Sequence, residues 1–296
     1  MSSFNAGDLS GFAQVLHAQF TDSSADERCL ATRFVHRLAM LDVQHLSIDS
    51  LAGAIRAIYE RSRVRHPGDA LVEVHSDASN TYLFVVTDDM SFLVDSVTMA
   101  LATAGRSVHS ILHPQLVIQR SSDGVLQSVL DLSVDDDIPS TALAESWMIV
   151  QLQHARGLES DDQLVHAVRE VLSDVRAAND DWHLMSDRVS AVAEHLRMNA
   201  PQGATLEEVQ EAVDLLEWLV ADHFTFLGYR AYEAVDGGTS SVMRPVEGSD
   251  LGLLRSQALG GRRTIDLPPT VRPEALERHL VIVNKTGSRS TVHRSA

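Results

Sequence analysis

Lysine is nearly absent from this sequence, and cysteine is equally rare. Lys285 is the only lysine, so arginine supplies the basic charge, and the net charge is -17 over 296 residues. A surface this acidic repels nucleic acid and anionic membranes, so we expect neither as a partner. The one cysteine, Cys29, excludes a disulfide framework and a thiolate metal cluster, and is typical of a reducing compartment.

Apolar runs of membrane-spanning length are also missing. The first residues, MSSFNAGDLSGF, contain no basic segment followed by an apolar one, as a secretory signal would. We therefore expect a cytoplasmic protein that has no membrane partner.

The usual signatures of catalysis and of nucleotide binding are missing as well. The sequence has no G-x-G turn, no G-x-x-x-x-G-K-[ST] loop, no H-E-x-x-H and no G-x-S-x-G. The glycine-rich turns depend on the backbone freedom of glycine, so their absence is informative. We predict that this chain has no catalytic residue and binds no cofactor.

Hydrophobic periodicity predicts an α+β protein in three parts. Residues 1–66 form a helical segment of about three pieces, which the His-Pro-Gly-Asp sequence at 66–69 closes. Residues 67–200 contain short β-rich runs that alternate with helices. Residues 201–296 begin with a helix and continue as strands, which predicts a second α+β module.

The middle part has the element order of a ferredoxin-like βαββαβ unit. Strands are predicted around a helix over 92–104, which Gly105 ends, and a second helix over 161–178 starts with a capping box at Ser160 and Gln163. Both helices carry a narrow apolar stripe at the same spacing, in which Leu101 and Leu172 are equivalent. We therefore predict that both helices cover one face of an antiparallel sheet. A separate helix is predicted over 186–197.

The third part opens on a second capping box, and its later strands are less regular. Thr205 and Glu208 start a helix, and FTFLGYRAYEA follows it as a strand. A short helix is predicted at DLGLLRSQ, and HLVIVNK is predicted as the last strand.

A polar corner joins a predicted strand to the first of these helices. It consists of Asp88, Asp89, Met90, Ser91 and Phe92. Adjacent residues that leave a strand point in different directions, so the two carboxylates are a poor acid/base pair. One carboxylate is expected to accept amide protons at the helix start. The alternative is that the corner and the helix amides bind a small ligand, and the two roles are compatible.

Two other groups of polar residues are weaker candidates for a metal site. His109 and His113 share a face if the segment is a strand, but no third ligand is evident nearby, and solvent-facing histidines are expected. Asp135, Asp136 and Asp137 are expected to be a solvated acidic loop. We predict no metal site.

The segment TDDMSFLVDSVTMALATAGRSVHSILHP resembles a stretch of the large, single-polypeptide NAD-dependent glutamate dehydrogenases of bacteria. Four later pieces resemble that family in the same order: ESWMIVQL at 145–152, WLVADHFTFLGYRAY at 218–232, GSDLGLLR at 248–255 and SRSTVHR at 288–294. Ser91 stands where that family usually has proline. Residues 1–65 show no such similarity.

The resemblance implies that this chain is a non-catalytic, N-terminal regulatory fragment. In that family the dehydrogenase domain lies far downstream and oxidises L-glutamate with NAD. The resemblance also implies an ACT-like domain at 67–200 and an incomplete, PAS-like module at 201–296. The implied partners are the downstream dehydrogenase domain, other subunits of a homo-oligomer and a free amino acid. Because such enzymes use lysines to hold the substrate carboxylate, a chain with Lys285 alone is not expected to contain their active site.

One departure from the ACT pattern bears on ligand binding. ACT domains resembling this one place glycine where the first strand turns into the first helix, and Phe92 stands at that position here. Its ring would fill the pocket that glycine leaves open, so the fold is better supported than the effector site. Two alternatives stay open: a stand-alone binding or oligomerisation module, and an acid/base enzyme that uses Asp88 and Asp89.

Overall fold

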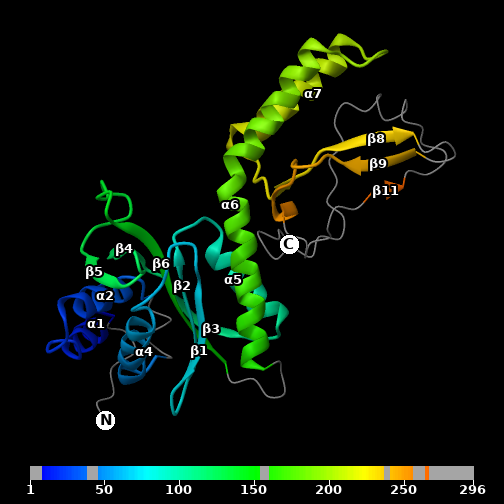
Figure 1. Cartoon of the computed structure of the whole chain (residues 1–296). Helices are drawn as coiled ribbons and strands as arrows, with labels where there is room; N and C mark the ends of the chain where they lie inside the picture. The colour runs from blue at the N-terminus through cyan, green and yellow to red at the C-terminus, as the bar shows by residue number, and fades with distance from the viewer. Residues whose placement is uncertain (1–8, 39–45, 154–159, 237–240, 256–263, 267–296) are drawn as a thin grey trace. The chain divides into compact units, whose positions relative to one another are not determined.

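The computed structural model describes residues 9–38, 46–153, 160–236, 241–255 and 264–266 (Figure 1). The chain separates into two compact units, residues 1–172 and 173–296, and the boundary falls inside a helix. The boundaries 1–66, 67–200 and 201–296 stay predictions.

Among the described residues, three helices precede the sheet of the first unit, in keeping with the periodicity. They are α1 (Leu9–Ala18), α2 (Ala25–Val35) and α4 (Ile48–Arg61). A capping box of Ser24 and Glu27, which the sequence analysis missed, starts α2. Ser47 is the N-cap residue of α4 as expected, although its side chain makes no capping hydrogen bond. Their apolar sides join one face of the sheet in a single core, so these helices are part of the first unit.

The first unit is built on an antiparallel sheet with the strand order β1-β2-β6-β4-β5, and β3 also pairs with β6. Its strands are β1 (Leu71–Ser76), β2 (Thr81–Asp88), β3 (Val108–Leu112), β4 (Gln115–Arg120), β5 (Leu126–Leu130) and β6 (Leu143–Leu152). The strand β6 is central: Phe84 of β2 lies opposite Ile149, and Leu112 of β3 is the partner of the same residue on the other side.

The sheet departs from a simple βαββαβ order at one edge. In such a unit a last strand returns after the second helix, whereas here β1, which comes before β2 in the chain, occupies the edge beside β2. The strands β3 and β4 follow one another along β6 and are interrupted at Pro114, whose carbonyl accepts from the Trp147 amide at 3.1 Å. Since proline has no amide to donate, the strand pairing is interrupted at this residue.

The helices α5 (Leu93–Thr103) and the start of α6 (Asp161–Met198) lie on the opposite side of the sheet from α1, α2 and α4 (Figure 1). Arg106, just after α5, pairs with Asp161 at the start of α6 at 2.9 Å. Leu101 and Leu172, the equivalent residues of the two predicted stripes, are both buried. The predicted layer of two helices on one sheet face is therefore present, and the N-terminal helices cover the other face.

The local helix signals are correct, but one helix is longer than predicted. Gly105 has a positive φ of 68°, and the Arg106 amide donates to the Leu101 carbonyl at 2.8 Å, as in a glycine-ended helix. The capping box of Ser160 and Gln163 is formed. The helices predicted over 161–178 and 186–197 are one helix, α6, because no glycine or proline interrupts residues 179–185.

The second unit packs the end of α6 against α7 (Leu206–Trp218), which starts at the predicted capping box of Thr205 and Glu208. The helical turn η1 (Leu219–His223) follows. Two small antiparallel sheets come next, with the orders β10-β7 and β11-β9-β8. Their elements are β7 (Gly228–Tyr229), β8 (Tyr232–Asp236), β9 (Ser241–Pro245), β10 (Leu251–Gly252), η2 (Leu253–Arg255) and β11 (Ile265–Asp266).

The expected strand over 224–234 is thus two short strands, β7 and β8, and the expected short helix is the 3₁₀ turn η2. The strand predicted at HLVIVNK lies outside the described residues. Within the described part of the chain, no helix is long and apolar enough to cross a membrane.

Candidate functional site

The corner of residues 88–92 lies where β2 ends and α5 begins, and its two carboxylates point to opposite faces of the sheet. Asp88 pairs with Arg65 at 2.6 Å and accepts from the Gly68 amide at 2.9 Å. Asp89 accepts from the hydroxyl of Ser146 and from the side-chain amide of Gln115, the latter at 2.9 Å. The divergence expected for adjacent residues is therefore confirmed.

The expectation that one aspartate caps α5 is wrong. The N-cap residue is Phe92, and the hydrogen bonds described for Asp89 go to β4 and β6 rather than to helix amides. The reason is register: the Asp89 amide donates to the Ala144 carbonyl at 3.0 Å, which holds the residue in line with β2 beyond the end of the strand. The chain turns two residues later, so both carboxylates stay with the sheet.

Phe92 has a left-handed backbone conformation, with φ at 69°. Glycine adopts this conformation without a steric penalty, whereas a side chain with a Cβ costs about 1–2 kcal/mol. Phe92 thus occupies the place that glycine takes in the resembling ACT pattern and keeps a glycine-like backbone. Met90 and Phe92 are half-buried, and Ser91 is exposed.

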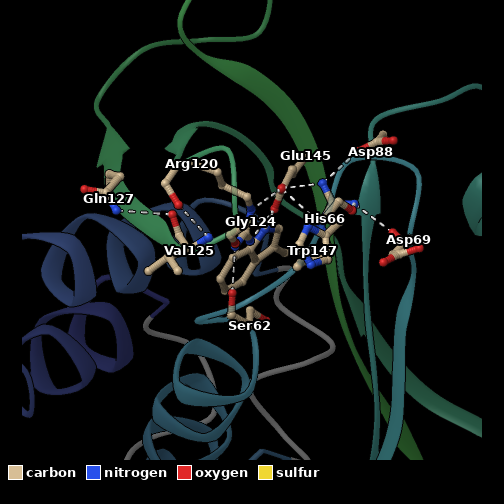
Figure 2. A network of polar contacts seen from close by, with 12 residues as sticks. Ser62, His66, Asp69, Asp88, Arg120, Gly124, Val125, Gln127, Glu145 and Trp147 are labelled. Atoms are coloured by element: carbon tan, nitrogen blue, oxygen red, sulfur yellow. Dashed lines mark hydrogen bonds and ion pairs between the residues drawn. The ribbon is translucent and has the colours of Figure 1, made fainter.

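On the Asp88 side, charged side chains and one tryptophan form a polar network (Figure 2). We call it the arginine cluster, and its members are Arg65, Asp88, Arg120, Glu145 and Trp147. Glu145 is fully buried at the centre. Arg65 Nε and Arg120 Nε donate to its Oε1 at 3.0 and 2.7 Å. Arg120 Nη2 and Trp147 Nε1 donate to its Oε2 at 3.0 and 2.9 Å.

Backbone carbonyls around the cluster accept hydrogen bonds from the Nη1 atoms of both arginines. Arg120 Nη1 donates to the carbonyls of Ser62 and Gly124 at 2.9 and 3.0 Å, and Arg65 Nη1 donates to that of Asp69 at 2.7 Å (Figure 2). The segment after α4 therefore binds to the β4–β5 turn through both side chains and backbone.

Gly124 is required for that approach. Its φ is 75°, and a Cβ there would lie 2.7 Å from the Arg65 carbonyl oxygen. The Arg65 amide donates to the Gly124 carbonyl at 2.9 Å, and Val64 bridges Val125 beside it. Any larger residue would separate the two segments and open the cluster.

The charges of the arginine cluster balance, since two guanidinium groups face two carboxylates. Burial alone lowers the pKa of Arg65, but Glu145 and Asp88 outweigh burial, so the pKa lies above its ordinary value. Each ion has partners with good geometry, which is the condition under which a buried ion pair persists. The cluster therefore holds α4, the β4–β5 turn and β6 together and is not a reactive centre.

On the Asp89 side lies a smaller group, which we call the hydroxyl cluster: Asp89, His113, Gln115 and Ser146. His113 Nε2 lies 2.9 Å from Ser146 Oγ. Because the Ser146 hydroxyl donates to Asp89, Ser146 Oγ is free to accept a hydrogen bond from His113 Nε2–H. Burial lowers the pKa of His113, Arg37 lowers it further and Asp89 opposes both.

The expectation of two solvent-facing strand histidines is wrong for one of them. His109 is exposed on β3, but His113 lies between β3 and β4, is half-buried and hydrogen-bonds with the buried Ser146. The pairing of β3 with β6 shifts register between Val108 and Ser110, so the alternation of a regular strand does not extend from His109 to His113.

Neither cluster has the arrangement of an active site. A nucleophilic serine gives its proton to histidine, whereas Ser146 gives its proton to Asp89 and is fully buried. Among the described residues, no group of three or more His, Cys, Asp or Glu side chains is placed to hold a metal ion. What the corner offers is a half-buried carboxylate, Asp89, held by neutral donors at a helix start.

The corner is visible in the sequence, but its partners are not. The partners Arg65, Arg120, Glu145 and Ser146 are far from it in the sequence, with separations of 80 residues between Arg65 and Glu145 and 57 between Asp89 and Ser146. The available signal was the glutamate that opens the largely apolar run ESWMIVQL, since a buried carboxylate needs cationic partners.

The first unit is similar to a known protein family. Residues 30–168 match the family described as glutamate dehydrogenase, ACT1 domain. The chain is 28% identical over 242 residues to the NAD-specific glutamate dehydrogenase of Halomonas elongata, which is 79% of this chain and 15% of that protein. It is 32% identical over 222 residues to the enzyme of the same name from Pseudomonas aeruginosa, which is 74% of this chain and 13% of that protein. The chain thus spans a small part of the length of these relatives.

Proposed function

We propose that this chain, whose residues 30–168 are a glutamate dehydrogenase ACT1 domain, is the non-catalytic N-terminal regulatory region of a large NAD-dependent glutamate dehydrogenase. The observation that carries the proposal is the family match, together with relatives of which the chain spans only 15% and 13%. The whole enzyme would oxidise L-glutamate to 2-oxoglutarate and ammonium and would reduce NAD.

Two features of the chain support a regulatory rather than a catalytic role. Lys285 is the only lysine, which leaves no second lysine to hold a substrate carboxylate as the related enzymes do. The polar groups of the corner are bonded to one another in both clusters. We therefore assign NAD to the whole enzyme and not to this region.

The corner Asp88–Phe92 is proposed as a contact to another domain or as a weak effector site for a free amino acid. Asp88 is committed to Arg65, so Asp89 is the carboxylate better placed for a ligand. The side chain of Phe92 disfavours a deep pocket at this point. Residues 201–296 are proposed as a PAS-like module that precedes the dehydrogenase domain in the sequence.

The remaining proposals concern the surroundings of the chain. We propose cytoplasmic location, in keeping with one cysteine and a net charge of -17, and assembly as a homo-oligomer. A stand-alone module is not favoured, because both relatives described above are far longer than this chain.

Calorimetry with a panel of amino acids tests the effector role. The comparison uses the wild-type chain, Asp89→Ala, and His109→Gln as a matched control that changes an exposed polar residue outside the corner. Weak binding that Asp89→Ala abolishes and His109→Gln keeps would support an effector site. Binding that survives in Asp89→Ala would place the ligand elsewhere, and no binding in any variant would leave the domain-contact role.

A further inference from the structure

The outward side of α7 presents a tryptophan among carboxylates. Glu211, Asp214, Leu215 and Trp218 follow the spacing i, i+3, i+4, i+7 and therefore share one helical face, which we call the α7 outer face. Leu215 is 41% exposed and Trp218 is 50% exposed. The opposite face of α7 is buried against α6 through Val209, Ala212, Val213 and Leu216. Leu215 and Trp218 are therefore not part of the buried core of this unit.

The charged side chains that α7 itself carries are all acidic. From Met198 to Tyr229 the sequence contains no lysine and no arginine. Its carboxylates in this range are Glu207, Glu208, Glu211, Asp214, Glu217 and Asp222. Among the described residues, the one carboxylate of α7 with an arginine partner is Glu217, which Arg197 binds at 2.5 Å. The carboxylates of the outer face have no cationic neighbour in that part of the structure.

The tryptophan is held in place rather than loosely exposed. The ring of His223 stacks on Trp218 with centroids 4.8 Å apart and planes 19° from parallel. The His223 side chain also lies 3.1 Å from the Trp218 carbonyl, at Nδ1. Asp222, with φ at 58°, turns the chain so that His223 returns to the helix. A fixed aromatic ring loses little entropy on binding, which is why tryptophan is common at the centres of interfaces.

We propose that the α7 outer face docks an arginine-bearing helical segment of another polypeptide. A guanidinium group stacks on an aromatic ring and forms paired hydrogen bonds with carboxylates, and this face offers both partners side by side. Leu215 supplies the apolar contact between them. The α7 outer face of a second copy does not suit this face, because it brings carboxylates and no arginine.

The test uses synthetic helical peptides and the whole chain. One peptide carries leucine and arginine at i, i+3, i+4, i+7 spacing, a second carries lysine in place of arginine, and a third carries glutamate. Fluorescence anisotropy measures the Kd of each at low and moderate salt. Trp218→Ala and Asp214→Asn alter the face, while Trp182→Ala and Asp187→Asn remove an equally exposed tryptophan and an exposed aspartate on α6.

The arginine peptide should bind best, and Trp218→Ala should raise its Kd about tenfold or more. Asp214→Asn should raise it about threefold and reduce its salt dependence. The α6 variants should leave it unchanged, and circular dichroism should show that all variants remain folded. Equal losses in Trp218→Ala and Trp182→Ala, or equal binding of the lysine peptide, would overturn the proposal in favour of general attraction to an acidic surface. A dimer in sedimentation that Trp218→Ala abolishes would overturn it in favour of a second copy.

Discussion

Asp88 and Asp89 are neighbours in the chain, yet they belong to two different kinds of polar cluster. Asp88 joins charged partners in the arginine cluster, where Glu145 and both arginines are buried. Asp89 joins neutral partners in the hydroxyl cluster and carries the only formal charge there when His113 is neutral. The alternation of a strand places one on each face of the sheet. The comparison teaches that two identical neighbouring residues can belong to different polar clusters on opposite faces of one sheet.

The largest expected effect breaks the arginine cluster at its centre. Glu145→Gln leaves two buried guanidinium groups with Asp88 as their one carboxylate, so it should lower the free energy of unfolding by about 3–5 kcal/mol. Urea denaturation measures the loss. Glu73→Gln is the matched control, since Glu73 is a partly exposed strand residue that pairs with Arg61, and it should cost about 0–1 kcal/mol. Equal losses would show that burial does not distinguish the two ion pairs.

The next largest effect is expected in the apolar packing of α5 and α6 on the sheet. Leu101→Ala and Leu172→Ala each remove a buried side chain and should cost about 2–5 kcal/mol. Leu184→Ala, at an exposed position of α6, should stay within about 0.5 kcal/mol. If the buried leucines behaved like Leu184 in denaturant titration, the packing of α5 and α6 on this face would be refuted.

A smaller effect is expected at Asp89 itself. Asp89→Ala leaves the buried Ser146 hydroxyl without this acceptor, so it should cost about 1–3 kcal/mol. Helix capping is no longer the reason, because Phe92 is the N-cap residue. The double variant Asp89→Ala with Ser146→Ala should cost less than the sum of the single changes. Additive losses would show that the two residues are not coupled.

The smallest effect is a pH dependence of the hydroxyl cluster. The pKa of His113 is below its ordinary value of 6.5 in the folded chain, so the unfolded chain takes up the proton first as the pH falls. The contribution of His113 to stability is therefore present above pH 6.5 and is lost below it. Urea titrations at about pH 7.5 and pH 5.5 should show a smaller loss in His113→Gln than in the wild type. His109→Gln, at an exposed position, should lose as much stability as the wild type between these two pH values. If His113→Gln lost as much as the wild type, His113 would not be the source of the pH dependence.

Features that depend on neighbouring residues were predictable from the sequence. The capping boxes at Ser160 and Thr205 and the glycine end of α5 at Gly105 all require only a few residues in a row. The two apolar stripes correctly placed Leu101 and Leu172 in the core. The corner was also identified, because two carboxylates between a strand and a helix are visible in the sequence.

Features that depend on distant residues were not predictable. Two separate helices were expected where α6 is continuous, and Asp181 lies in the expected gap. Asp181 is buried, accepts from the Gly252 amide at 2.7 Å and pairs with Arg255. The partners of the corner lie in segments that only the fold brings together. A carboxylate that could cap a helix and one that pairs across a sheet look the same in sequence, so the capping prediction failed for that reason.

The most direct test of the regulatory assignment is an assay of NADH formation by the isolated chain with glutamate and NAD. We expect no turnover above the blank, because the chain has a single lysine and no glycine-rich dinucleotide turn. Turnover that stays with the chain through successive purification steps would contradict the assignment and would require a catalytic site in these residues.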